Sequence, residues 1–109
     1  MSRQKLFEDQ FTNERRLAWV RFTSQCRFRA EPCELTFKQF CDFWSTPTLW
    51  NRRGRNPTDF VLTRFDPKQS WNKQNCCIIT RRNQLIIRNL RKINKDVSEY
   101  YTEAMTYAG

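Results

Sequence analysis

The chain has 109 residues, a length that suits one domain, and its 39% apolar and 15% aromatic content is typical of a globular protein. No apolar run approaches the roughly 18 residues of a membrane span, and the start of the chain lacks the apolar core of a signal sequence, so we expect a cytoplasmic protein without a membrane partner. The net charge of +9 is uneven: residues 50–95 contain twelve Lys or Arg against two Asp, and residues 96–109 contain three acidic residues.

The first half of the chain predicts two helices. From Arg3 to about Arg29 there is no Pro or Gly, and apolar residues recur at helical spacing, which predicts one long helix. Pro32 ends it, because the residue before a proline is pushed out of the helical region. Thr36 with Gln39 three residues later is the pattern of a capping box, and it predicts a second helix. Its aromatic stripe is expected to pack on the first helix: Phe37, Phe40, Phe43 and Trp44.

The second half predicts a basic loop, a hairpin and a basic helix. Pro47 ends the second helix, and Gly54 and Pro57 indicate a loop over residues 49–58. Residues 60–65 and 76–79 are rich in β-formers and predict two short antiparallel strands joined through a turn at Asp66. Thr80 then caps a helix over residues 81–94. The buried stripe of this helix is expected to be Leu85, Ile86, Leu90 and Ile93, and Ser98 starts a last short helix.

These elements predict an α+β fold, a small and mostly helical single domain over residues 1–109. Residues 1–49 form a helical lead-in, residues 50–95 form the basic loop and a ββα unit, and residues 96–109 form a helical tail. The twelve basic residues of the middle segment are candidates for nucleic-acid binding, because each Lys or Arg that displaces a counterion from phosphate adds affinity. They are Arg52, Arg53, Arg55, Arg64, Lys68, Lys73, Arg81, Arg82, Arg88, Arg91, Lys92 and Lys95.

Histidine is absent and the five cysteines do not form CxxC pairs. The lack of histidine removes Cys-His and Ser-His nucleophile systems and zinc bound by imidazole. The odd number and the spacing of the cysteines favour free buried thiols over a metal site. Cys76 and Cys77 are adjacent on a strand and point to opposite faces, so at most one of them is expected in the core.

The residues of the predicted ββα unit carry a further pattern. It consists of Leu62-Thr63-Arg64-Phe65-Asp66-Pro67, then Trp71 and Asn75-Cys76, then Thr80, Asn83, Gln84 and Asn89. With Trp19, Cys26 and the aromatic helix upstream, it resembles small phage and mobile-element proteins related to HNH endonucleases, over roughly residues 15–92. In the HNH family the first strand supplies an Asp-His pair, in which His activates water and Asp helps to hold a divalent metal, and a loop Asn orients the His.

The resemblance implies an impaired active site in this chain. Thr63 and Arg64 occupy the positions of the Asp-His pair, Asn75 matches the central Asn, and Asn83 or Asn89 matches the last motif residue. Arginine cannot act as a general base, although Arg64 can grip a phosphate bidentately. Asp66 and Asn75 are weak catalytic candidates, and we expect no cofactor unless nuclease activity survives with Mg²⁺. Enzymatic activity is thus undecided, and the residues lean against it.

Several of these residues also have structural interpretations. Asn75 can cap or bridge its turn, and Asp66 can form an Asx turn ahead of Pro67 or an ion pair with an arginine. Three tryptophans, Trp44, Trp50 and Trp71, can stack on bases or lie in the core. The basic residues of the 81–95 helix can form an ordinary solvated face, although six cations without an acid disfavour that interpretation.

The leading hypothesis is a phage-type, catalytically impaired HNH-like protein that binds nucleic acid, with duplex DNA favoured over RNA because the resemblance implies it. One alternative is a small phage takeover factor that binds and modulates a host protein or ribonucleoprotein, such as a polymerase or the ribosome, since a basic surface with aromatic residues also suits an acidic partner. Another alternative is an active metal-dependent endonuclease that uses Asp66 and Asn75.

Overall fold

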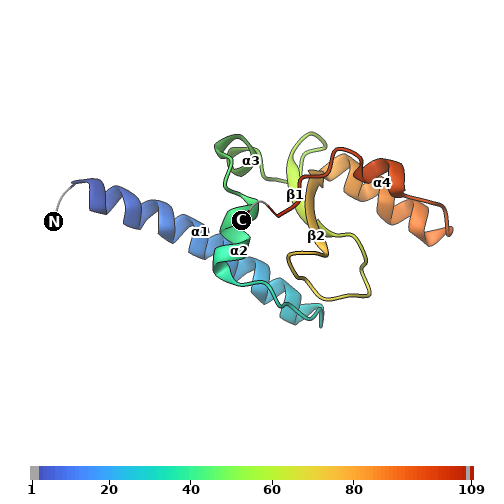
Figure 1. Cartoon of the computed structure of the whole chain (residues 1–109), viewed down its shortest axis with the longest axis horizontal. Coiled ribbons are helices and arrows are strands. Elements are labelled where there is room, and N and C mark those ends of the chain that lie inside the picture. The colour runs from blue at the N-terminus through green and yellow to red at the C-terminus, as the bar shows by residue number, and fades with distance from the viewer. Residues whose placement is uncertain (1–2, 108) are drawn as a thin grey trace.

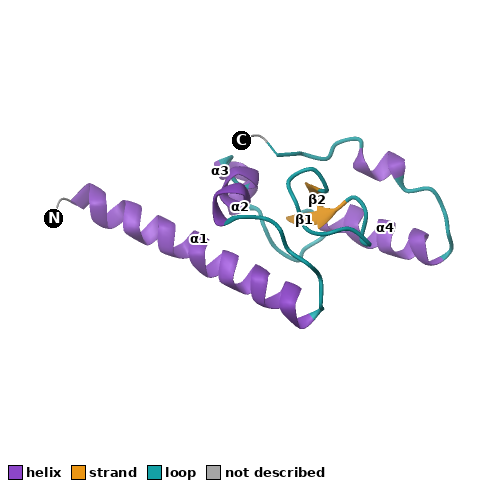
Figure 2. Cartoon of the chain, turned by 60° about the horizontal axis from the view of Figure 1, so that its bottom comes forward, coloured by secondary structure: helices purple, strands orange, loops and turns teal. Residues whose placement is uncertain are grey.

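The computed structural model describes residues 3–107 and 109, and their side chains from residue 13 onward. Over these described residues, four α-helices, a two-stranded antiparallel sheet and one 3₁₀ turn make up a small α+β fold, as predicted (Figures 1 and 2). The elements are α1 (Arg3–Phe28), α2 (Phe37–Phe43), α3 (Pro47–Asn51), β1 (Phe60–Arg64), β2 (Cys76–Thr80), α4 (Arg81–Lys92) and η1 (Ser98–Tyr101). The long α1 gives the molecule an elongated shape of 56 × 27 × 23 Å.

The β-hairpin is the centre of the fold. Its register pairs Phe60 with Thr80 at one end and Arg64 with Cys76 at the other, so the two predicted strands are confirmed. The tail adds a third segment to the sheet, since Ile78 and Met105 exchange two backbone hydrogen bonds of 2.8 and 3.0 Å. The chain then returns to α2 (Figure 1), where the Tyr107 hydroxyl donates to the Asp42 carboxylate at 3.1 Å.

Both faces of the hairpin are covered, which makes the prediction for the adjacent cysteines wrong. Cys76 and Cys77 are each 0% exposed. Because side chains alternate along a strand, Cys76 and Ile78 face one cluster and Cys77 and Ile79 face another. Helices α1 to α3 supply most of the first cluster, while α4 and the tail supply the second. A strand with only one covered face would have exposed one of the two thiols.

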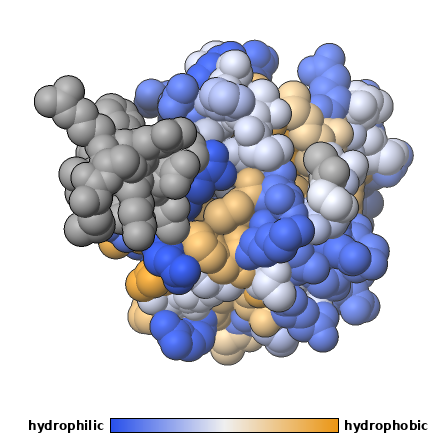
Figure 3. All heavy atoms as spheres, turned by 60° about the vertical axis from the view of Figure 1, so that its left-hand side comes forward, coloured by the Kyte–Doolittle hydropathy of each residue, from blue (hydrophilic) through white to orange (hydrophobic). Residues whose placement is uncertain are grey.

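The first cluster is built from aromatic rings. Trp44, Trp50 and Trp71 are 3%, 6% and 8% exposed, so these three rings lie in the core and are not available to stack on bases. Phe22 contacts Trp71 edge to face, with 4.9 Å between ring centroids. Large aromatic rings therefore supply most of the buried apolar area in this cluster, in place of aliphatic side chains. Hydrophilic atoms cover most of the coloured part of the face drawn in Figure 3, and apolar atoms are exposed at its centre, lower left and upper right.

Helix α2 ends at Phe43, just before the predicted stop at residues 45–47, but helix α3 corrects the prediction that a loop begins at Leu49. Pro47 is instead the first residue of α3, a position where proline is tolerated because that backbone N–H has no partner in the helix. Leu49 and Trp50 are 6% exposed and join the first cluster. Their burial stabilises a single helical turn that is too short to persist alone.

The buried face of α4 also differs from the prediction. Ile87 is 4% exposed and packs on Cys77 and Ile79, whereas Leu85 is 38% exposed. Two residues along a helix are about 200° apart, so burial of Ile87 turns Leu85 outward. Ile93 is 62% exposed because the helix ends at Lys92 and Ile93 is its C-cap. The predicted N-terminal cap is confirmed: the Thr80 hydroxyl accepts from the Asn83 N–H at 3.2 Å.

Helix α1 ends in a Schellman motif around a left-handed alanine. Ala30 has φ 56°, and the N–H of Glu31 bonds the carbonyl of Cys26 at 2.8 Å while that of Ala30 bonds the carbonyl of Arg27 at 3.1 Å. Helix α4 ends in the same way at Asn94, whose φ is 57°. Asparagine tolerates this conformation, but for alanine it is strained. The end of α1 therefore has a well-defined but costly geometry.

Ala30→Gly is expected to stabilise the protein by about 0.5–1 kcal/mol, because glycine removes the left-handed strain at a smaller entropic cost. The thermal midpoint should rise by a few degrees, about 2–6 °C, in calorimetry. Ala18→Gly, in the interior of the same helix, is the control and should destabilise by about 1 kcal/mol. A lower midpoint for Ala30→Gly would contradict the left-handed conformation of this residue.

Candidate nucleic-acid interface

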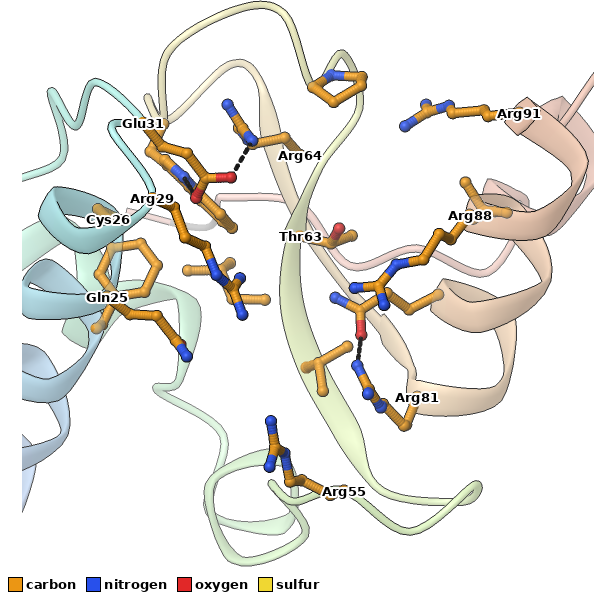
Figure 4. Close-up of a pocket in the computed structure, with 17 residues that line it drawn as sticks. Gln25, Cys26, Arg29, Glu31, Arg55, Thr63, Arg64, Arg81, Arg88 and Arg91 are labelled. Carbon is orange, nitrogen blue, oxygen red and sulfur yellow. Dashed lines mark hydrogen bonds and ion pairs between the residues drawn. The ribbon is translucent and has the colours of Figure 1, made fainter. Parts of the chain in front are cut away.

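A groove with a volume of about 520 Å³ lies between the C-terminal end of α1 and helix α4, with β1 between them (Figure 4). Glu31 is the one acid among the described residues that line it. Six arginines line it as well: Arg29, Arg55, Arg64, Arg81, Arg88 and Arg91. We call this feature the arginine groove. Its lining is strongly cationic although it comes from four separate stretches of the chain.

Helix α4 forms one wall of the arginine groove. Arg81, Gln84, Arg88 and Arg91 recur at intervals of three and four residues and therefore share one side of the helix. This side is adjacent to the buried face at Ile87, so the guanidinium groups lie over the sheet. In Figure 4 the Arg88 side chain extends from α4 toward Thr63 on β1.

The opposite wall and one end come from outside α4. Arg29 follows the last residue of α1 and points across the groove toward β1 (Figure 4). Arg55 belongs to the loop between α3 and β1 and lies at one end of the groove. The hydrogen bonds that hold this loop in place include the Asn56 N–H to the Asp59 carboxylate at 3.0 Å and the Gly54 N–H to the Phe60 carbonyl at 3.3 Å.

The cations of the arginine groove repel one another. The pKa of Arg81 is lowered first by burial and then by the positive charges of Arg88, Arg55 and Arg29. Arginine keeps its proton at neutral pH, so the repulsion persists in the free protein. For Arg29, Arg55 and Arg88 the described residues provide no hydrogen-bond or ion-pair partner. An anion in the groove would satisfy these donors and relieve the repulsion.

Arg64 lines the groove but its guanidinium group is already occupied. It donates to the Glu31 carboxylate at 2.9 Å and to the Gln69 carbonyl at 2.8 Å. It also lies over the Trp71 ring, 4.9 Å from the centroid, and the residue is only 9% exposed. These contacts link β1 to the end of α1 and to the turn. They favour a structural role for Arg64 over the phosphate contact predicted from the sequence.

Arg91 is engaged in a similar way. Its guanidinium group donates to the Phe65 carbonyl and, at 3.1 Å, to the Tyr101 hydroxyl. The Tyr101 hydroxyl in turn donates to the Arg64 carbonyl at 3.2 Å. Through its Nη2 atom, Arg91 therefore ties α4 to the end of β1 and to the tail, and it contributes charge to the groove.

The other predicted cations lie outside the lining of the groove. Arg52 donates to the Thr58 carbonyl at 3.0 Å, and Arg53 donates to the Trp50 carbonyl at 3.2 Å while lying over the Trp50 ring. The remaining five are exposed: Lys68, Lys73, Arg82, Lys92 and Lys95. The structure thus brings together Arg55, Arg64, Arg81, Arg88 and Arg91 of the twelve candidates, and it adds Arg29.

Arg29 was missed because it precedes the basic segment by more than twenty residues. The available signal was a cation at the end of the predicted first helix, but cations are common there because they interact favourably with the helix dipole. Only the packing of α1 beside the hairpin shows that Arg29 faces α4.

Asp66 and Asn75 have the structural roles that were open alternatives. The Asn75 amide accepts from the Asp66 N–H at 3.0 Å and donates to the carbonyls of Asp66 and Ser70 at 3.0 and 2.9 Å. The Asp66 carboxylate accepts from the Lys68 N–H at 2.9 Å, which makes an Asx turn around Pro67. Asn75 therefore bridges the turn between the strands, with its amide fully used.

The remaining positions of the HNH-like pattern also lack a carboxylate or a base. Thr63 is the fourth of the five residues of β1 and lines the groove, and it pairs with Cys77 on β2. The Asn83 amide donates to the Tyr100 carbonyl at 3.4 Å, and Asn89 is exposed. Within the described residues no group of three or more acidic, cysteine or histidine side chains could hold a metal ion.

The five cysteines are free, as predicted. Burial raises the pKa of Cys26, Cys76 and Cys77 to about 12, and it also raises the pKa of Cys41. The thiols of Cys26, Cys76 and Cys77 are therefore protonated near neutral pH. A protonated thiol is a poor nucleophile and a poor metal ligand. Their contribution is to the packing of the two core clusters.

The chain matches no protein-family profile, and no curated protein or solved structure shows significant similarity to it. In the part of the chain that the structure describes, none of the helices has the length and apolar character needed to cross a membrane.

Proposed function

We propose that this protein binds nucleic acid by seating a phosphate backbone in the arginine groove. The observation that carries the proposal is the convergence of Arg29, Arg55 and Arg88 on this groove. Among the described residues, these three arginines have no partner, and Glu31, the one acid in the lining, is paired with Arg64. Arginine suits this task because its planar fork binds phosphate oxygens bidentately. Each phosphate that it neutralises also releases a condensed counterion.

The amount of charge in the groove supports a backbone over an isolated anion. Its cations come from the end of α1, the loop before β1 and successive turns of α4, and Arg29, Arg55 and Arg88 lie near enough to Arg81 to lower its pKa. More positive charge converges there than one phosphate would neutralise, whereas a nucleic-acid backbone supplies several phosphates. Contacts of this kind position a nucleic acid without reading its bases.

The order of β1, β2 and α4, together with the residues from Leu62 to Asn89, supports a relation of this segment to the ββα unit of HNH endonucleases. We propose that the chain is a phage-type variant that retains binding and is impaired in cleavage. Thr63 and Arg64 replace the metal-binding Asp and the His base, and Arg64 is committed to Glu31. Duplex DNA is the favoured ligand because the HNH relation implies it.

The proposal is tested by fluorescence anisotropy with duplex DNA, single-stranded DNA and structured RNA at two salt concentrations. Contacts of Arg29, Arg55, Arg81 and Arg88 with phosphates predict a slope of log affinity against log salt of about −3 to −4. Plasmid nicking with Mg²⁺ or Mn²⁺ is assayed in parallel, and we expect none. No binding near physiological salt, together with nuclease-resistant capture of one stoichiometric host protein, would contradict the proposal and favour the modulator of a host protein.

A further inference from the structure

Phe28 is an aromatic side chain that the fold leaves almost completely in solvent. It is 91% exposed, the highest value among the exposed large hydrophobic residues, while the next is Ile93 at 62%. A single exposed apolar residue is common on protein surfaces. The position of Phe28 is what distinguishes it, because it lies beside the arginine groove on a firmly held support.

The neighbours of Phe28 connect it to the groove. Arg29 follows it directly and Gln25 precedes it by one turn, and both line the groove. Phe28 is about 60° around the helix from Gln25 and about 100° from Arg29, so it projects to one side of the groove rather than into it. Arg27 on its other side is also exposed. The Phe28 ring is therefore an exposed apolar group next to the cationic residues Arg27 and Arg29.

The backbone beneath Phe28 is held in one geometry. The two hydrogen bonds of the Schellman motif fix the last turn of α1 around Ala30. The next residue, Glu31, accepts from Arg64 at 2.9 Å and from the Trp71 indole at 3.3 Å, which ties this end of the helix to β1 and the core. Little conformational entropy of the backbone would be lost if a ligand covered the ring.

We infer that Phe28 stacks on a nucleobase when the arginine groove holds the adjoining phosphates. The inference rests on the proposed function and extends it from backbone to base contact. The chemistry is the π-face of a base, which an exposed ring can contact regardless of base identity. Two sources can present that face: a base step of a duplex that the ring enters as a wedge, or an unpaired base.

Phe28→Ala is expected to weaken binding by about 5- to 150-fold, the range for loss of one stacked base, while the salt slope stays unchanged. Phe28→Trp should retain the affinity. Leu17→Ala, which removes a half-exposed apolar side chain from the same helix about 16 Å away, is the matched control and should bind like the wild type. Circular dichroism confirms that each variant is folded.

Oligonucleotides that contain 2-aminopurine separate the two sources. If the fluorescence of a probe inside a duplex rises on binding of the wild type but not of Phe28→Ala, the ring enters the duplex as a wedge and unstacks a base step. If the fluorescence of a probe in a single strand is quenched by the wild type but not by Phe28→Ala, the ring stacks on an unpaired base. Equal affinity of the wild type and Phe28→Ala, with wild-type salt dependence intact, would overturn the inference and leave the arginine groove standing. Absence of any binding by the wild type would overturn both.

Discussion

Reversing one charge on the groove wall, Arg88→Glu, is expected to lower the affinity for nucleic acid by about 30-fold or more. The loss combines one charge-assisted hydrogen bond to phosphate, about 1.5–3 kcal/mol, with repulsion from the new carboxylate. The salt slope should become shallower by about one unit, because one fewer counterion is released. Anisotropy titrations at several salt concentrations measure both quantities. Arg88 is exposed, so folding should be little affected.

Arg82→Glu is the matched control for Arg88→Glu. It makes the same change of charge on the same helix, but Arg82 is exposed and lies outside the lining of the groove. Its effect should be limited to the long-range change in net charge, a loss of a few-fold that salt screens. Equal losses for the two variants would show that binding depends on total charge and does not use the arginine groove.

Arg64→Ala is expected to destabilise the fold by about 3 kcal/mol while leaving the salt slope of nucleic-acid binding unchanged. The substitution removes the ion-pair partner of Glu31, whose side chain is 23% exposed. It also removes the contact of the guanidinium group with the Trp71 ring. Breaking a largely buried ion pair typically costs about 3–5 kcal/mol, and partial exposure of Glu31 places this one at the lower end. Urea unfolding measures the free energy, and the thermal midpoint should fall by more than about 10 °C.

Lys38→Ala provides the comparison for this variant. Lys38 pairs with Asp42 at 3.6 Å on the surface, with the lysine side chain 83% exposed, so its loss should cost no more than about 0.5 kcal/mol. A double-mutant cycle of Glu31→Ala with Arg64→Ala should give a coupling of at least about 1 kcal/mol. If Arg64→Ala kept wild-type stability but lowered the salt slope by about one unit, Arg64 would be a phosphate contact, as the sequence alone predicted.

These two predictions separate the cations that bind from the cations that hold the fold together. Arg64 and Arg91 lie in the groove wall, yet their guanidinium groups are bonded to Glu31, Tyr101 and backbone carbonyls. They keep the hairpin, α4 and the tail in place, so that Arg29, Arg55 and Arg88 face a common space. The free-energy cost of bringing these cations together is met during folding. An incoming phosphate therefore finds hydrogen-bond donors that are already oriented.

The sequence by itself determined the local elements. The Thr36 box with Gln39 is present as predicted, since Thr36 accepts from the Gln39 N–H at 3.2 Å and the Gln39 side chain accepts in return at 3.0 Å. The hairpin strands, the long first helix and the cap at Thr80 are also confirmed. Each depends on residues within a few positions of one another, and such short-range rules of capping, spacing and β-propensity can be read without knowing the neighbours in space.

Tertiary structure decided which face of each element is buried and which cations meet. The pattern of α4 allows a buried stripe at Leu85 or at Ile87, and only contact with Cys77 and Ile79 selects Ile87. That rotation aims Arg88 into the groove, and the packing of α1 beside β1 brings Arg29 opposite it. Glu31 and Arg64 are 33 residues apart. No local rule relates residues at such separations, because their contact depends on how the elements pack.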